Sequence, residues 1–425
     1  MGIYYQHIDV TDFGPYVTKL VLALPAKIQA ENIKPDQFIV YVKILDKNGQ
    51  VAMLPKSFLE RDNLVPSEAY RVITDAYPCT LGGSRQEEGT YLALEMKYGP
   101  MYPCSSAIAS NPKSINGHGY YMISDYTITQ VAPIKTDGEP LKGLVFDHCA
   151  GARNPKREQF RLGASSNGMR YGYYIPKLSA GGKHPLIIFL HGAGEGGLDT
   201  AIAFTGNKVT AFAEPYAQEI FGGAFVLVPQ CDTMWLDDGS HAYGDSGKSM
   251  YVKDLKQTID EFIADYAGAI DKKRIYVGGD SNGGFMTMRM MMDYPRFFAA
   301  GFPICEAMLD KRIRKRDIEN LAKIPIWFTH AKNDPVVKPD QYVVPTYERI
   351  IAAGAKNCHF TFWDKIIDRY AGWDTPDGKP MEYFGHFAWI PMLNDDCKLD
   401  YDGKPVLLDG EPTTIFRWMA AQKKS

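Results

Sequence analysis

The feature that most constrains the fold is a serine between glycines, where a strand-like segment meets a helix-like one. Gly279-Asp280-Ser281-Asn282-Gly283 fits the pattern G-x-S-x-G, after RIYVGG and before a methionine-rich helical pattern. A strand that turns directly into a helix strains the serine backbone, and side chains two residues to either side would collide. The pattern therefore predicts a tight turn that holds the Ser281 hydroxyl clear of a sheet, as a nucleophile requires.

The segments around this turn predict an α/β domain over residues 158–425. An Asn-Gly hairpin is expected within 159–178, and strand-like and helix-like segments alternate after it. The expected strands are apolar without polar alternation, and they span 185–192, 224–230, 274–280, 299–306, 324–331 and 358–364. Helices are expected near 249–268, from 282, near 343–353 and over 412–424. This order predicts a mostly parallel sheet covered on both faces.

The first part of the chain has a different pattern, that of an all-β sandwich over residues 1–147. Short alternating strands are expected at 17–25, 37–46, 91–99 and 119–134, separated by clusters of Asn, Gly, Pro and Ser. The expected role of this domain is binding or packing. Residues 147–157 are polar, contain Gly and Pro, and show no periodicity, so the domain boundary is predicted there.

Composition excludes several classes of partner. The 425 residues, 45% of them hydrophobic, suffice for two domains with sizeable cores, and a net charge of -3 offers no basic field for nucleic acid or a membrane surface. No apolar run reaches the length of about 18 residues that spans a bilayer. The seven cysteines include no C-x-x-C pair, so no zinc site is expected. The N-terminal residues lack the pattern of a secretory signal, which leaves two locations open: the cytoplasm, or a secreted or periplasmic place after signal removal.

A serine nucleophile needs a base within hydrogen-bond reach and an acid that orients the base. After a turn of this kind, the acid and the histidine follow the serine in that order. Asp334, just beyond a strand, is the expected acid; Asp340 is its rival, and capping of a turn is the alternative role. His386, in a loop after the last expected strand, is the expected base. Two other histidines lie in or at the end of strands: His359, and His330, which is expected to be a positioning residue.

The glycine-rich segment 185–197 is expected to help bind the negative charge of a tetrahedral intermediate. Such a site takes one backbone N–H from the residue after the nucleophile and one from a loop after an earlier strand. We expect these two N–H groups to be the backbone amides of Asn282 and Ala193, and we expect Gly194 to contact the substrate. The alternative is a phosphate-binding loop, but the Lys-Ser/Thr ending and the G-x-G-x-x-G spacing are missing.

Two long polar loops, 231–250 and 364–385, follow expected strand ends and are expected to shape specificity. Four aromatic residues are candidates for stacking on an aromatic acid or a sugar: Trp235, Tyr243, Trp373 and Trp389. Trp235 and Trp389 are the expected substrate-binding residues among them. The alternative is that these rings only anchor their own loops.

The segments HGAGEGG, GGDSNGG, HAKNDPVV and GHFAW together resemble the α/β-hydrolases, and in particular esterases with an N-terminal immunoglobulin-like domain, related to polyhydroxybutyrate depolymerase-like and feruloyl esterase-like enzymes. The hydrolase resemblance covers about 158–425 and implies an α/β-hydrolase fold after an all-β immunoglobulin-like sandwich. Two departures stand out. Ala331 replaces a usual glycine, and Asp280 and Asn282 flank the serine where apolar residues are commoner, which is expected to make the pocket more polar.

These features predict a serine carboxylesterase that cleaves a small-molecule ester, with a small, aromatic or carbohydrate-linked part, through an acyl-enzyme on Ser281. No metal or organic cofactor is expected, and the oligomeric state is not specified. Two alternatives remain. One is a serine peptidase of the prolyl oligopeptidase type, although its usual propeller is absent from the first half of the chain. The other is a non-catalytic binding protein on a hydrolase scaffold.

Overall fold

The computed structural model describes residues 2–46, 48–57, 60–110, 118–178, 181–240, 246–375 and 377–424. The chain forms two compact units, Met1–Ser110 with Tyr120–Glu158, and Asn111–Gly119 with Gln159–Ser425. Each unit encloses a hydrophobic core of its own.

The first unit is built almost entirely from strands. They are β1 (Gly2–Thr11), β2 (Gly14–Gln29), β3 (Phe38–Leu45), β4 (Met53–Ser57), β5 (Glu60–Pro66), β6 (Glu68–Arg71), β7 (Ile73–Cys79), β8 (Glu88–Met96), β9 (Ile108–Ser110), β10 (Gly119–Tyr121), β11 (Ile123–Gln130) and β12 (Val145–Arg153). The short helices are η1 (Ala30–Asn32), η2 (Pro35–Gln37), η3 (Pro103–Ser105) and α1 (Pro155–Glu158). All four strand segments expected from the sequence are present, so the all-β prediction is confirmed.

The sheet of the first unit curls around its core. Its eight strands follow the order β6-β3-β11-β12-β1-β2-β8-β7, so β6 and β7 stand at opposite ends. Only Val72 separates these two strands along the chain, and the sheet must therefore roll until its edges approach each other. Buried side chains of β2, β3, β8 and β11 accordingly belong to one core. Along β3 and β11 buried and exposed residues alternate, as in strands with one covered face.

The boundary between the units differs from the prediction. Residues 147–157 are not a linker, because β12 continues to Arg153, α1 follows, and the first unit extends to Glu158. β12 pairs in parallel with β1 through its backbone, while most of its side chains are exposed. A strand without a buried face has no apolar alternation, so the sequence pattern did not indicate it.

The second unit alternates strands and helices. Its strands are β13 (Arg161–Ala164), β14 (Arg170–Tyr174), β15 (His184–Leu190), β16 (Phe225–Gln230), β17 (Ile270–Asp280), β18 (Ala300–Ile304), β19 (Ile326–Ala331), β20 (Cys358–Trp363), β21 (Leu407–Leu408) and β22 (Glu411–Pro412). Its helices are η4 (Ala193–Glu195), α2 (Ile202–Thr205), η5 (Val209–Ala213), α3 (Pro215–Phe221), α4 (Val252–Asp265), α5 (Asn282–Asp293), η6 (Asp310–Arg312), α6 (Lys315–Leu321), α7 (Val343–Ala352), α8 (Trp389–Leu393) and α9 (Ile415–Ala421). The expected hairpin is formed by β13 and β14.

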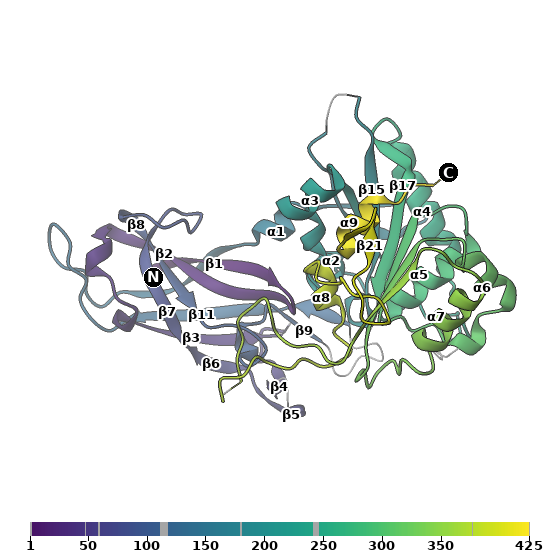
Figure 1. The fold of residues 1–425 in the computed structure, drawn as a ribbon. Coiled ribbons are helices and arrows are strands. Elements are labelled where there is room, and N and C mark those ends of the chain that lie inside the picture. Colours follow the sequence, from purple (N-terminus) through teal and green to yellow (C-terminus); the bar gives the residue numbers. More distant parts are fainter. Residues whose placement is uncertain are drawn as a thin grey trace. The chain divides into compact units, whose positions relative to one another are not determined.

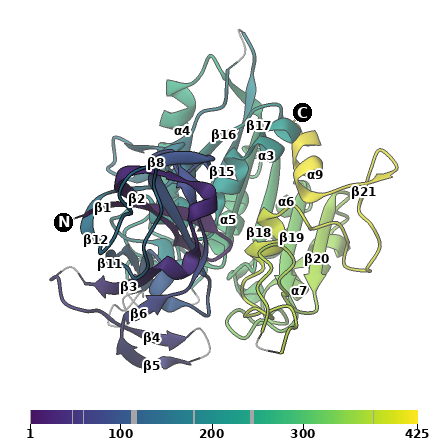
Figure 2. The same ribbon diagram turned by 90° about the vertical axis from the view of Figure 1, so that its left-hand side faces the viewer.

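The main sheet of this unit has the order β13-β14-β16-β15-β17-β18-β19-β20, and from β16 to β20 all neighbours are parallel. Figure 2 shows β18, β19 and β20 following one another across the sheet. Parallel strands end at the same edge, so the loops after β15, β17 and β19 gather there. The predicted α/β architecture is confirmed.

Helices cover both faces of this sheet, with α4 and α5 on one side of β17 and α3 and α9 on the other (Figure 1). Ile275 and Val277 of β17 enter the core that α4 and α5 share, whereas Tyr276 packs on Phe221 of α3 with ring centroids 6.1 Å apart. α4, a helix expected near 249–268, buries an apolar stripe that includes Leu255, Ile259 and Phe262.

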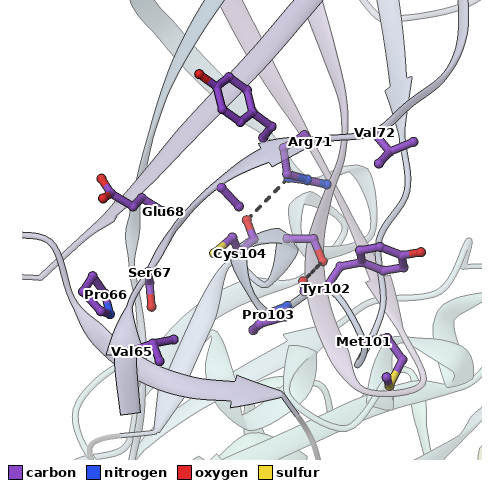
Figure 3. Close-up of a pocket in the computed structure, with 13 residues that line it drawn as sticks. Val65, Pro66, Ser67, Glu68, Arg71, Val72, Met101, Tyr102, Pro103 and Cys104 are labelled. Carbon is purple, nitrogen blue, oxygen red and sulfur yellow. Dashed lines mark hydrogen bonds between the residues drawn. The ribbon is translucent and has the colours of Figure 1, made fainter. Parts of the chain in front are cut away.

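The first unit holds a small hollow of about 270 Å³, lined by residues 65–72 and 101–105 (Figure 3). Arg71 closes one side, and its guanidinium donates to Tyr126 Oη at 2.6 Å and to the carbonyls of Val17 and Lys97 at 2.9 Å each. These contacts give Arg71 a structural role. Within the described ranges no helix is both long and apolar enough to cross a membrane.

Candidate active site

Ser281 lies between β17 and α5 in a strained backbone conformation. Its φ is 54° and its ψ is -113°, a combination that residues other than glycine rarely adopt. The Ser281 N–H donates to the carbonyl of Ile304 on β18 at 2.9 Å, which holds the turn against the sheet. A Cβ on Gly279 or on Gly283 would collide with the carbonyl oxygen of Leu190 on β15. The two glycines are therefore required by the close approach of the turn to β15.

Hydrogen bonds join the three side chains that the sequence selects. Ser281 Oγ lies 2.8 Å from His386 Nε2, and His386 Nδ1 lies 2.7 Å from Asp334 Oδ2. Since a carboxylate only accepts, Nδ1 carries the imidazole proton and the Nε2 lone pair accepts the serine hydroxyl. This arrangement can withdraw a proton from Ser281.

Asp334 is buried and accepts hydrogen bonds at both oxygens. Besides His386, His330 Nε2 lies 2.9 Å from Oδ2, while the amides of Val336 and Val337 donate to Oδ1 at 2.8 and 3.1 Å. Burial raises the pKa of Asp334, but the hydrogen bonds from His330 and His386 outweigh it and hold the pKa well below its usual range. The carboxylate therefore stays charged, and His330 occupies the place of a positioning residue.

The rival residues lie elsewhere. Asp340 is exposed, and it is Asp334 that contacts His386. His359 Nδ1 lies 2.7 Å from Asp400 Oδ2, in a separate hydrogen bond. A Cβ on Gly385 would lie 2.7 Å from the carbonyl oxygen of Asn333, so this glycine lets the loop of the base pack on the loop of the acid.

The loop after β15 packs against the nucleophile turn. A Cβ on Gly283 would lie 2.7 Å from the His191 carbonyl oxygen, and one on Gly192 would lie 2.6 Å from Asp280 Oδ2. Ala193 begins η4 and is half-buried, and a Cβ on Gly194 would meet no atom within 4 Å. The segment expected to provide the second amide thus borders the serine turn and has open space beside it.

His191 fixes this loop from inside the unit, a role that sequence reasoning did not assign. Its Nε2 accepts the N–H of Cys231 at 3.2 Å, so Nδ1 carries the proton and donates to the Gly192 carbonyl at 2.6 Å. Burial lowers the pKa of His191 to about 4, and the imidazole is therefore neutral near pH 7.

The polar residues that flank the serine do not line an open pocket, contrary to expectation. Asp280 and Asn282 are each 1% exposed. Asn282 Oδ1 accepts the N–H of Leu236 at 3.0 Å, and Asp280 Oδ2 accepts from Asn207 Nδ2 at 2.9 Å. The side chains of Asp280 and Asn282 therefore make hydrogen bonds inside the unit, because the turn directs only the Ser281 side chain outwards.

The substrate contact expected for Trp235 is not supported. This side chain has no exposed area, and its ring packs 5.1 Å from that of His191 and 5.8 Å from that of Tyr251. A ring without exposed area offers no face to a ligand. Trp235 instead anchors the start of its loop in the core.

The other aromatic candidates differ in position. Trp389 opens α8, is 6% exposed, and lies edge-on to His386 with ring centroids 6.4 Å apart. Trp373 is half-buried, and its backbone N–H donates to the Asp368 side chain. Tyr243 falls outside the described residues. In the described part of the chain, no group of three or more His, Cys, Asp and Glu side chains is arranged to hold a metal ion.

Comparison with known proteins finds a matching family model within each unit. Residues 8–141 match the model of the esterase Ig-like N-terminal domain, and residues 178–365 match that of the phospholipase/carboxylesterase family. Feruloyl esterase B of Neurospora crassa is 29% identical over 169 residues, which are 38% of this chain and 52% of that protein. The match thus spans about half the length of that relative.

A solved structure described as a thermostable esterase shares the fold over 99% of both chains, with a TM-score of 0.73 and 24% identity. It therefore supports the same two-unit architecture along the whole sequence. The chain is thus similar to esterase Ig-like N-terminal domains over residues 8–141 and to the phospholipase/carboxylesterase family over residues 178–365, in the order that the sequence resemblance implies.

Proposed function

We propose that the protein is a serine carboxylesterase with Ser281 as nucleophile, His386 as general base and Asp334 as the group that orients the base. The observation that carries this proposal is the unbroken chain of hydrogen bonds from Ser281 Oγ through both nitrogens of His386 to Asp334, with distances of 2.8 and 2.7 Å. The match of residues 178–365 to the phospholipase/carboxylesterase model supports the same reaction class.

In the first half-reaction, Ser281 Oγ attacks the ester carbonyl carbon while its proton passes to His386 Nε2. The charged Asp334 stabilises the imidazolium. The carbonyl electron pair moves to oxygen, where the amides of Ala193 and Asn282 are proposed to donate. The tetrahedral intermediate then expels the alcohol, which takes the proton from Nε2, and the acyl group remains on Ser281.

Water completes the cycle by the same route. It attacks the acyl carbon, His386 accepts its proton, and collapse of the second tetrahedral intermediate releases the carboxylic acid and returns the proton to Ser281. The proposed substrates are esters with a small, aromatic or carbohydrate-linked part, an assignment supported by the similarity to feruloyl esterase B.

Hydrolysis of p-nitrophenyl acetate tests the proposal. Ser281→Ala is expected to lower kcat on the order of 10⁶-fold, since one missing member disables the whole catalytic unit. Wild-type activity in this variant would refute the assignment. A panel of acetyl, feruloyl and peptide substrates then tests the substrate class. Preferential cleavage of peptide bonds would show that the protein is a peptidase and not an esterase.

A further inference from the structure

Two carboxyl groups that the mechanism does not use converge behind the serine turn. Asp280 directly precedes Ser281, and Glu195 ends η4, two residues after Ala193. A Cβ on Gly192 would lie 2.6 Å from Asp280 Oδ2 and 2.8 Å from Glu195 Oε2, so both carboxyl groups border the same point of the backbone. One acid belongs to the nucleophile turn and the other to the loop that carries the second amide.

The two acids share hydrogen-bond partners. The Asn207 side chain donates to Asp280 Oδ2 at 2.9 Å and also to the carboxyl group of Glu195. The Gly192 N–H donates to Glu195 as well, while His191 holds the Gly192 carbonyl at 2.6 Å. Both backbone groups of Gly192 are therefore fixed immediately before Ala193.

The proton count of the pair follows from its surroundings. Glu195 is half-buried as a residue, but its carboxyl group lies inside the unit, and burial raises its pKa to about 7. Burial and the nearby Glu195 raise the pKa of Asp280 well above its usual range. Asp280 Oδ1 has no hydrogen-bond partner among the described residues, which disfavours an ionised Asp280.

Among the described residues, no Lys or Arg side chain contributes measurably to the pKa of either carboxyl group. The titratable neighbours are His191, His118 and Cys305, and burial favours the neutral form of each by lowering the pKa of the histidines and raising that of the thiol. Lys208, which follows Asn207, donates to Asn394 Oδ1, and Arg170 donates to Asp232 and to the Gly197 carbonyl.

We propose that Glu195 and Asp280 hold one proton between them and thereby position the Ala193 amide relative to Ser281. The inference rests on the proposed esterase function and adds two positioning residues to it. Loss of the shared proton places two negative charges side by side, and their repulsion separates the loop from the serine turn. Activity should therefore fall in the alkaline range.

The test measures kcat and KM for p-nitrophenyl acetate from about pH 6 to about pH 10. In the wild type kcat should fall at the alkaline end, whereas Asp280→Asn, which cannot acquire the second charge, should show no such fall. Asp280→Ala should lower kcat at least about tenfold with KM within twofold, the pattern of a weakened transition-state contact. Asp280→Asn should recover most of that loss.

Asp395→Asn is the matched control. Asp395 is also buried and burial raises its pKa, but its partners are Tyr216, Thr414 and Phe416. This variant should keep the wild-type profile. A wild-type kcat that stays level to about pH 10, identical profiles for wild type and Asp280→Asn, or wild-type kcat in Asp280→Ala would each overturn the proposal.

A readout without activity separates this inference from the proposed function. A carboxyl group whose folded pKa is raised destabilises the protein increasingly as pH rises from the unfolded value, about 4, towards the folded value. Asp280→Asn should therefore gain a few degrees in melting temperature over the wild type as pH rises from about 5 to about 9. Esterase activity that survives in Ser281→Ala would refute the proposed function but would leave this melting-temperature result intact. A difference in melting temperature between Asp280→Asn and the wild type that does not change with pH would refute only the inference about the shared proton.

Discussion

Two buried aspartates at the same edge of one sheet have pKa values shifted in opposite directions. Asp334 accepts four hydrogen bonds, two from imidazoles and two from backbone amides, and its pKa is held well below the usual range. Asp280 has the amide of Asn207 as its side-chain donor and faces Glu195, and burial raises its pKa. Both residues are nearly inaccessible to solvent, with Asp334 4% and Asp280 1% exposed.

Hydrogen-bond donors can therefore outweigh the effect of burial on the pKa of an acid, as they do at Asp334. A charged Asp334 can stabilise an imidazolium, while Asp280 is proposed to hold one proton together with Glu195. The same residue type thus serves as an electrostatic partner after β19 and as a link between two loops after β17.

The largest effect is expected for Asp334→Asn. The amide keeps the shape but removes the charge and disfavours the imidazole tautomer that accepts from Ser281, so kcat for p-nitrophenyl acetate should fall about 10⁴-fold. Circular dichroism and the melting curve control for the fold. A fall below tenfold would mean that the charge of Asp334 is not what the reaction uses.

A smaller effect is expected when one donor to Asp334 is lost. His330→Phe retains a ring but removes the N–H that lies 2.9 Å from Asp334 Oδ2, and kcat should fall about tenfold with little change in KM. His330→Gln offers an amide donor and should recover part of the loss. Equal kinetics for both variants would assign His330 to packing alone.

The smallest effect concerns stability against pH, where the two aspartates should show opposite signs. The lowered pKa of Asp334 contributes stability that is present above the unfolded value, about 4, and is lost as pH falls from there. Between about pH 5 and about pH 2 the wild type should therefore lose a few degrees more in melting temperature than Asp334→Asn. In Asp280→Asn the difference should instead grow towards alkaline pH. If the melting temperatures of Asp334→Asn and Asp280→Asn changed with pH in the same way, the two aspartates would not have pKa shifts of opposite sign.

Much of the fold of the second unit could be predicted from the sequence, because the steric and hydrophobic requirements of its elements involve residues that are close together along the chain. A strand that turns sharply into a helix needs Gly279 and Gly283, and apolar segments between amphipathic helices indicate a covered sheet. The order of Ser281, Asp334 and His386 then pointed to the three side chains that the structure joins by hydrogen bonds.

Other features depend on tertiary packing, which no local pattern records. Trp235 follows a strand end, yet whether its ring faces a ligand or the core is decided by His191 and Tyr251. β12 is held by backbone pairing with β1 and not by a buried face, so 147–157 read as a boundary. The meeting of Glu195 with Asp280, 85 positions apart, leaves no spacing signal.

Intact mass spectrometry after reaction with a fluorophosphonate, followed by peptide mapping, tests directly whether Ser281 is the activated nucleophile. Such a reagent phosphonylates a serine only when a neighbouring base activates it. We expect a single adduct on Ser281, absent from Ser281→Ala and formed much more slowly in Asp334→Asn. An adduct on another residue, or equal labelling of the wild type and Ser281→Ala, would contradict the account.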